Sequence, residues 1–185
     1  MSKILYIHGF ASCGQGNKSQ LLQSRFGVER VIAPDLPPSP IDAIEMIEEI
    51  LKSEPIDLLI GSSLGGFYAT YIAEKHGMKA ILINPSTQPW ETLASYTGWQ
   101  ERFCDEEVFE FKPIYLEQLK MLQTAPKQGK YLLLLQSEDE VLDYTKAQSL
   151  YNRHKIIVEY GGNHRFENLD EYISMIEKFL KNESK

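Results

Sequence analysis

The fold of this chain is decided by ten consecutive residues, Asp57-Leu58-Leu59-Ile60-Gly61-Ser62-Ser63-Leu64-Gly65-Gly66. They open with the apolar run of a buried strand, and the helical pattern of Phe67–His76 follows them. The G-x-S-x-G match between strand and helix is typical of a turn that holds a nucleophilic serine with its hydroxyl exposed. Gly61 and Gly65 allow the two sides of such a turn to lie close together, and the register makes Ser63 the candidate nucleophile. The alternative is a glycine-rich turn that serves only close packing of the helix on the strand.

The same alternation of strand and helix extends over the rest of the chain. Besides Asp57–Gly61, the runs with the composition of strands are Ile4–His8, Arg30–Ala33, Ala80–Asn84, Tyr131–Gln136 and Ile156–Tyr160. Amphipathic helices are predicted over Ser19–Phe26, Ile41–Lys52 and Tyr144–Tyr151, and a last helix follows Asn168. Ser39 and Asn168 are the candidate N-caps of the second and last of these helices. Such an alternation is typical of a parallel sheet with helices on both faces.

One segment, 85–128, interrupts this alternation. It contains no obvious strand, but it is rich in aromatic side chains: Trp90, Tyr96, Trp99, Phe103, Phe109, Phe111 and Tyr115. A structureless loop of that length is unusual inside a small domain. We therefore predict an inserted set of short helices, of which Ile114–Gln123 is the most helical part.

Length, charge and cysteine content limit the class of protein. A chain of 185 residues is long enough for one domain with its own core. The formal charge of −7 argues against nucleic acid or an anionic membrane as partner, and no apolar run reaches the roughly 20 residues that span a bilayer. No signal peptide is recognised, and Cys13 and Cys104 lie far apart without metal-ligand spacing. These features favour a cytoplasmic protein with reduced cysteines.

A serine nucleophile requires a base, and His164 is the better of two candidates that follow Ser63 late in the chain. It lies in the string Gly161-Gly162-Asn163-His164, directly after the last predicted strand, where loops of parallel sheets meet their ligands. The other candidate, His154, stands between Arg153 and Lys155 and is interpreted as a surface residue.

The acid that orients the base follows the strand Tyr131–Gln136, where four carboxylates lie close together. We favour Asp139, because it stands where the loop leaves the strand. Asp143 is the alternative, although it is better interpreted as the N-cap of the helix Tyr144–Tyr151. Glu138 and Glu140 are interpreted as solvated neighbours.

Acyl transfer also requires donors for the developing oxyanion. The backbone N–H of Leu64, next to the nucleophile, is one candidate, and the N–H of Phe10, in the loop after the first strand, is the other. Gly9 would allow that loop to approach, and His8 is expected to brace it by hydrogen bonding. The glycines and Lys18-Ser19 that follow superficially resemble a phosphate-binding loop, but the spacing G-x-x-x-x-G-K-[ST] is not met.

Over nearly its whole length the chain resembles the YqiA-type small bacterial esterases of the α/β-hydrolase superfamily. The resemblance rests on four strings in order: His8-Gly9-Phe10, Gly61-Ser62-Ser63-Leu64-Gly65-Gly66, Asp139-Glu140-Val141-Leu142-Asp143 and Gly161-Gly162-Asn163-His164. It implies a three-layer α/β-hydrolase fold as a single domain over residues 1–185, with a mostly parallel sheet of about six strands that lacks the first two antiparallel ones. It also implies a small helical lid at 85–128, whose alternative is that its aromatic side chains form only a local core.

The activity that the resemblance implies is hydrolysis of carboxylic esters with short acyl chains. The substrate would be a small-molecule acyl ester, no cofactor or metal would be needed, and the triad would be Ser63, Asp139 and His164. A thioesterase or another acyl-bond hydrolase would use the same residues. The non-enzymatic alternative is a ligand-binding protein on a hydrolase scaffold, because fold alone does not determine function.

Overall fold

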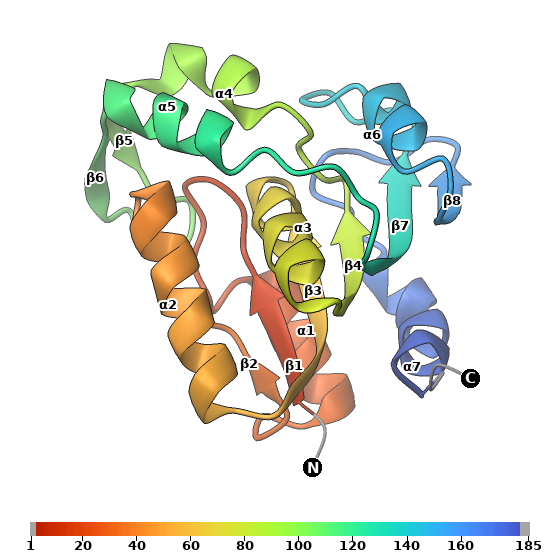
Figure 1. Cartoon of the computed structure of the whole chain (residues 1–185). Helices are drawn as coiled ribbons and strands as arrows, with labels where there is room; N and C mark the ends of the chain where they lie inside the picture. The colour runs from red at the N-terminus through yellow and green to blue at the C-terminus, as the bar shows by residue number, and fades with distance from the viewer. Residues whose placement is uncertain (1–2, 182–185) are drawn as a thin grey trace.

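A sheet of six parallel strands forms the centre of the computed structural model, which describes residues 3–181 (Figure 1). Of the domain predicted over 1–185, residues 1–2 and 182–185 therefore lie outside the described part. The strands are β1 (Lys3–Ile7), β2 (Val31–Ile32), β3 (Ile56–Ser62), β4 (Lys79–Ile83), β7 (Lys130–Gln136) and β8 (Lys155–Glu159). Their order across the sheet is β2-β1-β3-β4-β7-β8, so all six predicted strands are confirmed. The strand order reverses between β1 and β3, and such switch points are where parallel sheets bind ligands.

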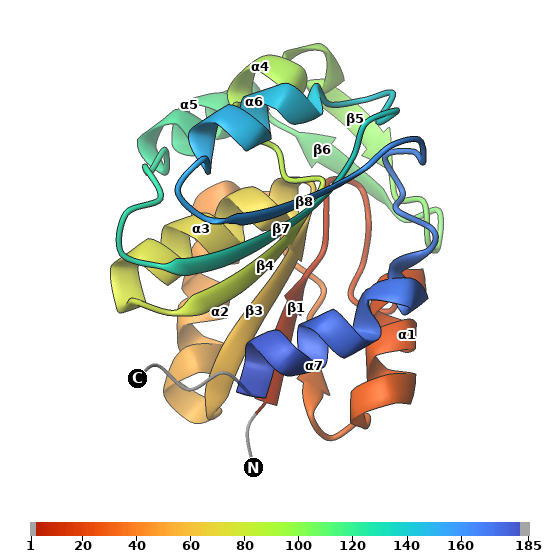
Figure 2. The same cartoon turned by 90° about the vertical axis from the view of Figure 1, so that its right-hand side faces the viewer.

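Helices cover both faces of this sheet (Figures 1 and 2). On one face lie α2 (Pro40–Ser53) and α3 (Leu64–His76), and on the other lie α1 (Asn17–Phe26) and α7 (Ile173–Lys181). The helix α6 (Tyr144–Leu150) joins the α2–α3 side, where Ala147 is buried. The predicted three-layer architecture is therefore confirmed.

Successive residues of each central strand pack into opposite cores. Leu5 and Ile7 of β1 face α2 and α3, whereas Ile4 and Tyr6 face α1 and α7. Adjacent side chains of a strand point to opposite faces, so an uninterrupted apolar run fills both cores at once. This two-sided burial gives the loops at the strand ends a rigid base.

Two of the three N-cap residues predicted from the sequence are confirmed. The Ser39 side chain accepts a hydrogen bond from the N–H of Asp42 and caps α2, and Asp143 caps α6 in the same way through Thr145. The expectation for Asn168 is wrong. A short 3-10 turn, Leu169–Tyr172, precedes α7, and the Asn168 side chain makes no capping bond, because its Oδ1 accepts from Gln136 Nε2 and its Nδ2 donates to the Glu159 carboxylate.

The insertion 85–128 is only partly helical, which corrects the sequence prediction. It contains α4 (Pro89–Thr92), a 3-10 turn (Ala94–Tyr96), an antiparallel hairpin of β5 (Gly98–Glu101) and β6 (Val108–Phe111), and then α5 (Pro113–Met121). In β6 exposed Val108 and Glu110 alternate with the inward-facing Phe109 and Phe111, which is a strand pattern. The insertion lies over the carboxyl ends of the strands (Figure 1).

Cys13 and Cys104 are paired in a disulfide, with 6.3 Å between their Cα atoms. The expectation of two reduced cysteines is therefore wrong. The pair is separated by 91 residues in sequence, but the turn between β5 and β6 folds back onto the loop after β1. The N–H of Phe103 in that turn donates to the carbonyl of Ala11, 2.8 Å away. Within residues 3–181, no helix combines the length and apolar character needed to cross a membrane.

Candidate active site

Ser63 lies between β3 and α3 in a strained backbone conformation, with φ 54° and ψ −121°. A residue other than glycine in such a region costs about 1–3 kcal/mol, and the surroundings must hold it there. Its N–H donates to the carbonyl of Ile83, and its own carbonyl accepts from the N–H of Ser86, each at 3.0 Å. A Cβ on Gly61 would overlap the backbone of Gly65, so the two sides of the turn touch as the sequence motif requires.

Ser63, His164 and Asp139 form a continuous chain of hydrogen bonds. His164 Nε2 lies 3.0 Å from Ser63 Oγ, and His164 Nδ1 lies 2.8 Å from Asp139 Oδ2 and 3.0 Å from Oδ1. An ionised carboxylate can only accept, so Nδ1 carries the proton and Nε2 of the neutral ring accepts from the serine hydroxyl. The Asp139 side chain is 2% exposed and that of His164 is 19% exposed, so the carboxylate is shielded from solvent while the imidazole is partly accessible.

The carboxylates of the loop after β7, which are close together in sequence, have different partners in the structure. Asp139 Oδ1 accepts the N–H groups of Val141 and Leu142 at 2.9 and 2.8 Å, which fixes the carboxylate toward His164. Asp143 is occupied as the cap of α6. Glu140 is exposed, but its carboxylate accepts the backbone N–H of His164 at 2.9 Å, and this bond lowers the pKa of Glu140. Glu140 is thus more than the solvated neighbour that the sequence indicated.

Two buried amides beneath the His164 loop were missed in the sequence. Asn84, directly after β4, contacts the carbonyls of Asn163 and His164, and Gln136, at the end of β7, accepts the N–H of Asn163 at 2.9 Å. Gln136 also donates to Glu159 at 3.0 Å. The available signal was the position of each amide at the end of an apolar strand.

The loop after β1 lies directly against Ser63. A Cβ on Gly9 would lie 3.8 Å from Ser63 Oγ, so this glycine brings the backbone close to the site. His8 Nε2 accepts the N–H of Leu36 at 3.0 Å, and Nδ1 therefore donates to the carbonyl of Gly9 at 2.8 Å. Burial lowers the pKa of His8, and both ring nitrogens are occupied, so this ring braces the loop.

Phe10 connects this loop to the insertion. Its ring makes edge contacts with Tyr96, Phe109 and Phe111, at centroid distances of 5.6, 5.7 and 5.1 Å. Phe111 is 1% exposed and belongs to the main core on the α3 side. Phe109 and Phe111 of the insertion therefore pack with the main core, whereas Trp99 and Phe103 are 72% and 79% exposed.

The other sequence candidates lie elsewhere or are otherwise occupied. His154 packs edge-on against Tyr131 at the start of β7, the opposite end from the Asp139 loop. In the glycine-rich loop, the N–H of Gly14 donates to Asp35 and the Ser19 hydroxyl donates to the carbonyl of Gly16, so both donors are already occupied. The described residues contain no group of three histidine, cysteine or acidic side chains placed to hold a metal ion.

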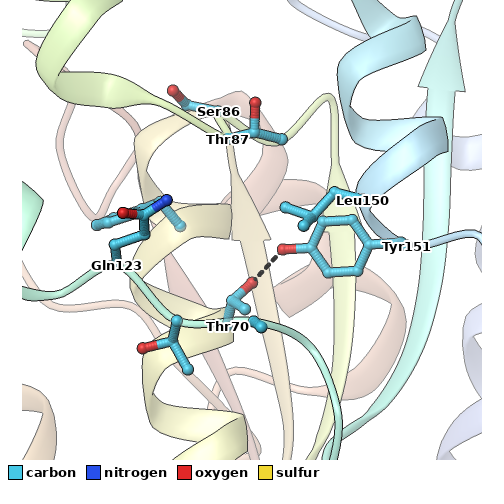
Figure 3. Close-up of a pocket in the computed structure, with 9 residues that line it drawn as sticks. Thr70, Ser86, Thr87, Gln123, Leu150 and Tyr151 are labelled. Carbon is cyan, nitrogen blue, oxygen red and sulfur yellow. Dashed lines mark hydrogen bonds between the residues drawn. The ribbon is translucent and has the colours of Figure 1, made fainter.

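A pocket of about 260 Å³ lies beside α3, one to two turns after Ser63 (Figure 3). Its lining includes Thr70 and Tyr151, whose hydroxyls lie 2.7 Å apart. The Ser86 hydroxyl, also in the lining, finds no partner within residues 3–181. Ser63, His164 and Asp139 are not among the residues that line this pocket, so the pocket lies beside the site and does not contain it.

The model of one protein family, described as "Uncharacterised protein family (UPF0227)", matches residues 3–181. The chain belongs to the UPF0227 family. A UPF0227 protein of Vibrio parahaemolyticus is 29% identical over 185 residues, covering 95% of this chain and 98% of the relative. A UPF0227 protein of Vibrio vulnificus is 27% identical over 188 residues, covering 97% and 99%.

Solved structures show which fold this UPF0227 chain has. Est1E from Butyrivibrio proteoclasticus superposes with a TM-score of 0.75 at 13% identity, covering 98% of this chain and 89% of Est1E. The mouse α/β hydrolase domain-containing protein 10 also superposes at 0.75, with 16% identity and coverage of 96% and 89%. A putative hydrolase from Agrobacterium vitis gives 0.75 at 14% identity, covering 97% and 88%. The fold is therefore that of the α/β hydrolases.

Proposed function

We propose that this protein is a serine hydrolase that cleaves small carboxylic esters through an acyl-enzyme intermediate. The observation that carries the proposal is the hydrogen-bond chain from Ser63 Oγ through His164 to Asp139, with links of 3.0 and 2.8 Å. The strained backbone of Ser63 supports it, because strain of this kind is retained where a site needs it. The resemblance to the YqiA-type esterases supports the choice of esters with short acyl chains.

In the proposed mechanism, Ser63 Oγ attacks the ester carbonyl while His164 Nε2 takes the serine proton. The Asp139 carboxylate holds Nδ1–H and stabilises the imidazolium that forms. The tetrahedral oxyanion is held by the N–H of Leu64, at the N-terminus of α3, and by that of Phe10. His164 then gives its proton to the leaving alcohol oxygen, and the acyl group remains on Ser63. In the second half, His164 takes a proton from water as the water oxygen attacks the acyl carbon. The bond between that carbon and Ser63 Oγ then breaks, His164 returns its proton to Ser63 Oγ, and the acid is released.

A substrate panel tests the reaction class. The protein is expected to react with a fluorophosphonate probe and to hydrolyse p-nitrophenyl acetate and butyrate with higher kcat/KM than the octanoate. Faster turnover of an acetyl thioester than of the matched oxygen ester would instead favour the thioesterase alternative. A protein that neither reacts with the probe nor turns over any ester would be the ligand-binding alternative, and the proposal would then be wrong.

We also propose that the insertion 85–128 acts as a lid that shapes the acyl pocket. The support is the position of Phe10, whose backbone is a proposed oxyanion donor and whose ring packs against Phe109 and Phe111 of the hairpin. Removing the whole insertion would be uninformative, because Leu119 and Phe111 are almost fully buried in the main core. The hairpin turn is the part that can be changed alone.

Replacing residues 102–107 by Asn-Gly is expected to change the dependence of kcat/KM on acyl-chain length. Glu101 and Val108 are paired across the hairpin, so a two-residue turn can connect them while the contact of the turn with the loop after β1 is lost. The change is made together with Cys13→Ser, and the control is Cys13→Ser/Cys104→Ser with the full-length turn. An acyl-chain profile that stays the same in the shortened variant would contradict the lid.

A further inference from the structure

We infer that Asn84 is a positioning residue that holds the His164 loop in line with Ser63; the inference rests on the proposed function. Asn84 follows β4 directly and is 3% exposed. β4 lies between β3, which leads to Ser63, and β7, which leads to the Asp139 loop. Among the described strands, only β4 adjoins both β3 and β7, and Asn84 stands at its carboxyl end.

The Asn84 amide connects the two segments that carry His164 and Asp139. Its Nδ2 donates to the carbonyl of Asn163 at 3.0 Å and to that of His164 at 3.3 Å. Its Oδ1 accepts the N–H of Gln136 at 2.9 Å, where the chain leaves β7 toward Asp139. The preceding residue, Ile83, accepts the N–H of Ser63. One buried side chain thus fixes the backbone of the proposed base and the start of the acid loop, beside the bond that holds the nucleophile.

The backbone at Asn84 explains why few residue types could replace it. Its φ is 39°, in the left-handed region where asparagine is tolerated better than most residues. Glycine would accept this conformation without the amide. Aspartate would keep the acceptor for the Gln136 N–H, but it would turn a carboxylate oxygen toward the two carbonyls that Nδ2 now satisfies. Asn84 therefore combines a permitted backbone with one acceptor and two donors.

The His164 loop needs such an anchor because its own backbone is permissive. Gly161 and Gly162 have φ values of 107° and 77°, and glycines allow many other conformations. Asn84 binds the backbone carbonyl of His164, and the ring of the same residue contacts Ser63 through Nε2. A displacement of about 1 Å in a catalytic group can cost about 100-fold in rate. Loss of the Asn84 donor is therefore expected to lower kcat rather than substrate binding.

The test compares Asn84→Asp and Asn84→Gly with Thr70→Val. Thr70, on α3, is also 3% exposed. Its hydroxyl donates to the carbonyl of Gly66 and lies 2.7 Å from the Tyr151 hydroxyl, and neither partner belongs to the His164 loop. We expect kcat for p-nitrophenyl acetate to fall about 10- to 100-fold in both Asn84 variants with KM within about twofold, and kcat to stay within about twofold in Thr70→Val. Backbone hydrogen exchange of residues 161–166 should accelerate in both Asn84 variants only.

The two readouts separate this inference from the proposed function. If the wild type turns over ester and folded Asn84 variants keep its kcat, the positioning role is wrong while the proposed function stands. If the wild type shows no turnover that depends on Ser63, the proposed function fails. Hydrogen exchange then still decides whether Asn84 holds the loop: faster exchange supports the anchor, and unchanged exchange overturns it.

Discussion

Ser63→Ala is expected to lower kcat for p-nitrophenyl acetate by about 10⁵- to 10⁶-fold, the scale seen when a nucleophilic serine is removed from a serine protease. The hydroxyl is the only group lost, and its hydrogen bond in the structure is to His164 Nε2. Without it, no acyl-enzyme can form and the imidazole has no alcohol to deprotonate. Hydrolysis that remains would come from the oxyanion donors and substrate binding alone.

The matched control is Ser62→Ala, one residue earlier in the same turn. Ser62 is 7% exposed and lies in β3, so this variant tests whether a buried hydroxyl in the turn matters for reasons of stability. It should keep activity within about twofold and react with a fluorophosphonate probe, whereas Ser63→Ala should remain folded by circular dichroism and stay unlabelled. If Ser63→Ala kept the labelling and turnover of the wild type, the nucleophile would be another residue.

The layered fold could be predicted from sequence because its signals are local and repeated. The runs at Leu58–Ile60 and Leu132–Leu135 are apolar on both faces, which only a covered parallel strand requires. Ser39 and Asp143 cap their helices through neighbours two or three residues away, so sequence spacing alone carries the information. The glycines around Ser63 were equally informative, because a close approach of backbone leaves no room for a side chain.

Features that depend on distant parts of the chain could not be predicted in this way. The hairpin of β5 and β6 is held by contacts of Phe109 and Phe111 with Phe10, nearly a hundred residues away in sequence. The disulfide between Cys13 and Cys104 follows from the same folding of the insertion onto the loop after β1. Short strands whose inward face is completed by a distant loop carry a weak local pattern.

The roles of the two amides beneath the His164 loop could not be predicted from the sequence for a different reason. Asn84 and Gln136 bind backbone groups of other segments, and a backbone N–H or carbonyl leaves no residue type by which a partner could be recognised. A buried amide at the end of a strand is still informative, because an unsatisfied polar group in that place costs about 1–3 kcal/mol. Such positions are candidates for contacts that hold a site together.

Asp139→Asn is expected to lower kcat by about 10⁴-fold, the loss measured for the equivalent change in a serine protease triad, while the protein stays folded. The reason is that Asp139 Oδ1 accepts hydrogen bonds from the backbone N–H groups of Val141 and Leu142. In the variant, the amide oxygen must keep this position, so the amide NH₂ faces His164 Nδ1. That nitrogen must then accept, and the ring proton moves to Nε2, where it faces Ser63. An Nε2 that carries the proton cannot take another from the serine hydroxyl.

Asp143→Asn is the matched control, because it makes the same chemical change four residues away in the same acidic string. Asparagine is as good an N-cap as aspartate, so the bond to the N–H of Thr145 survives and α6 should be unaffected. Activity within about twofold of the wild type is expected for this variant, with kcat and the melting temperature measured for both. Asp139→Asn and Asp139→Ala should differ in stability, since alanine leaves the N–H groups of Val141 and Leu142 without their acceptor. A large loss of kcat in Asp143→Asn, with Asp139→Asn nearly fully active, would transfer the role of the acid to Asp143.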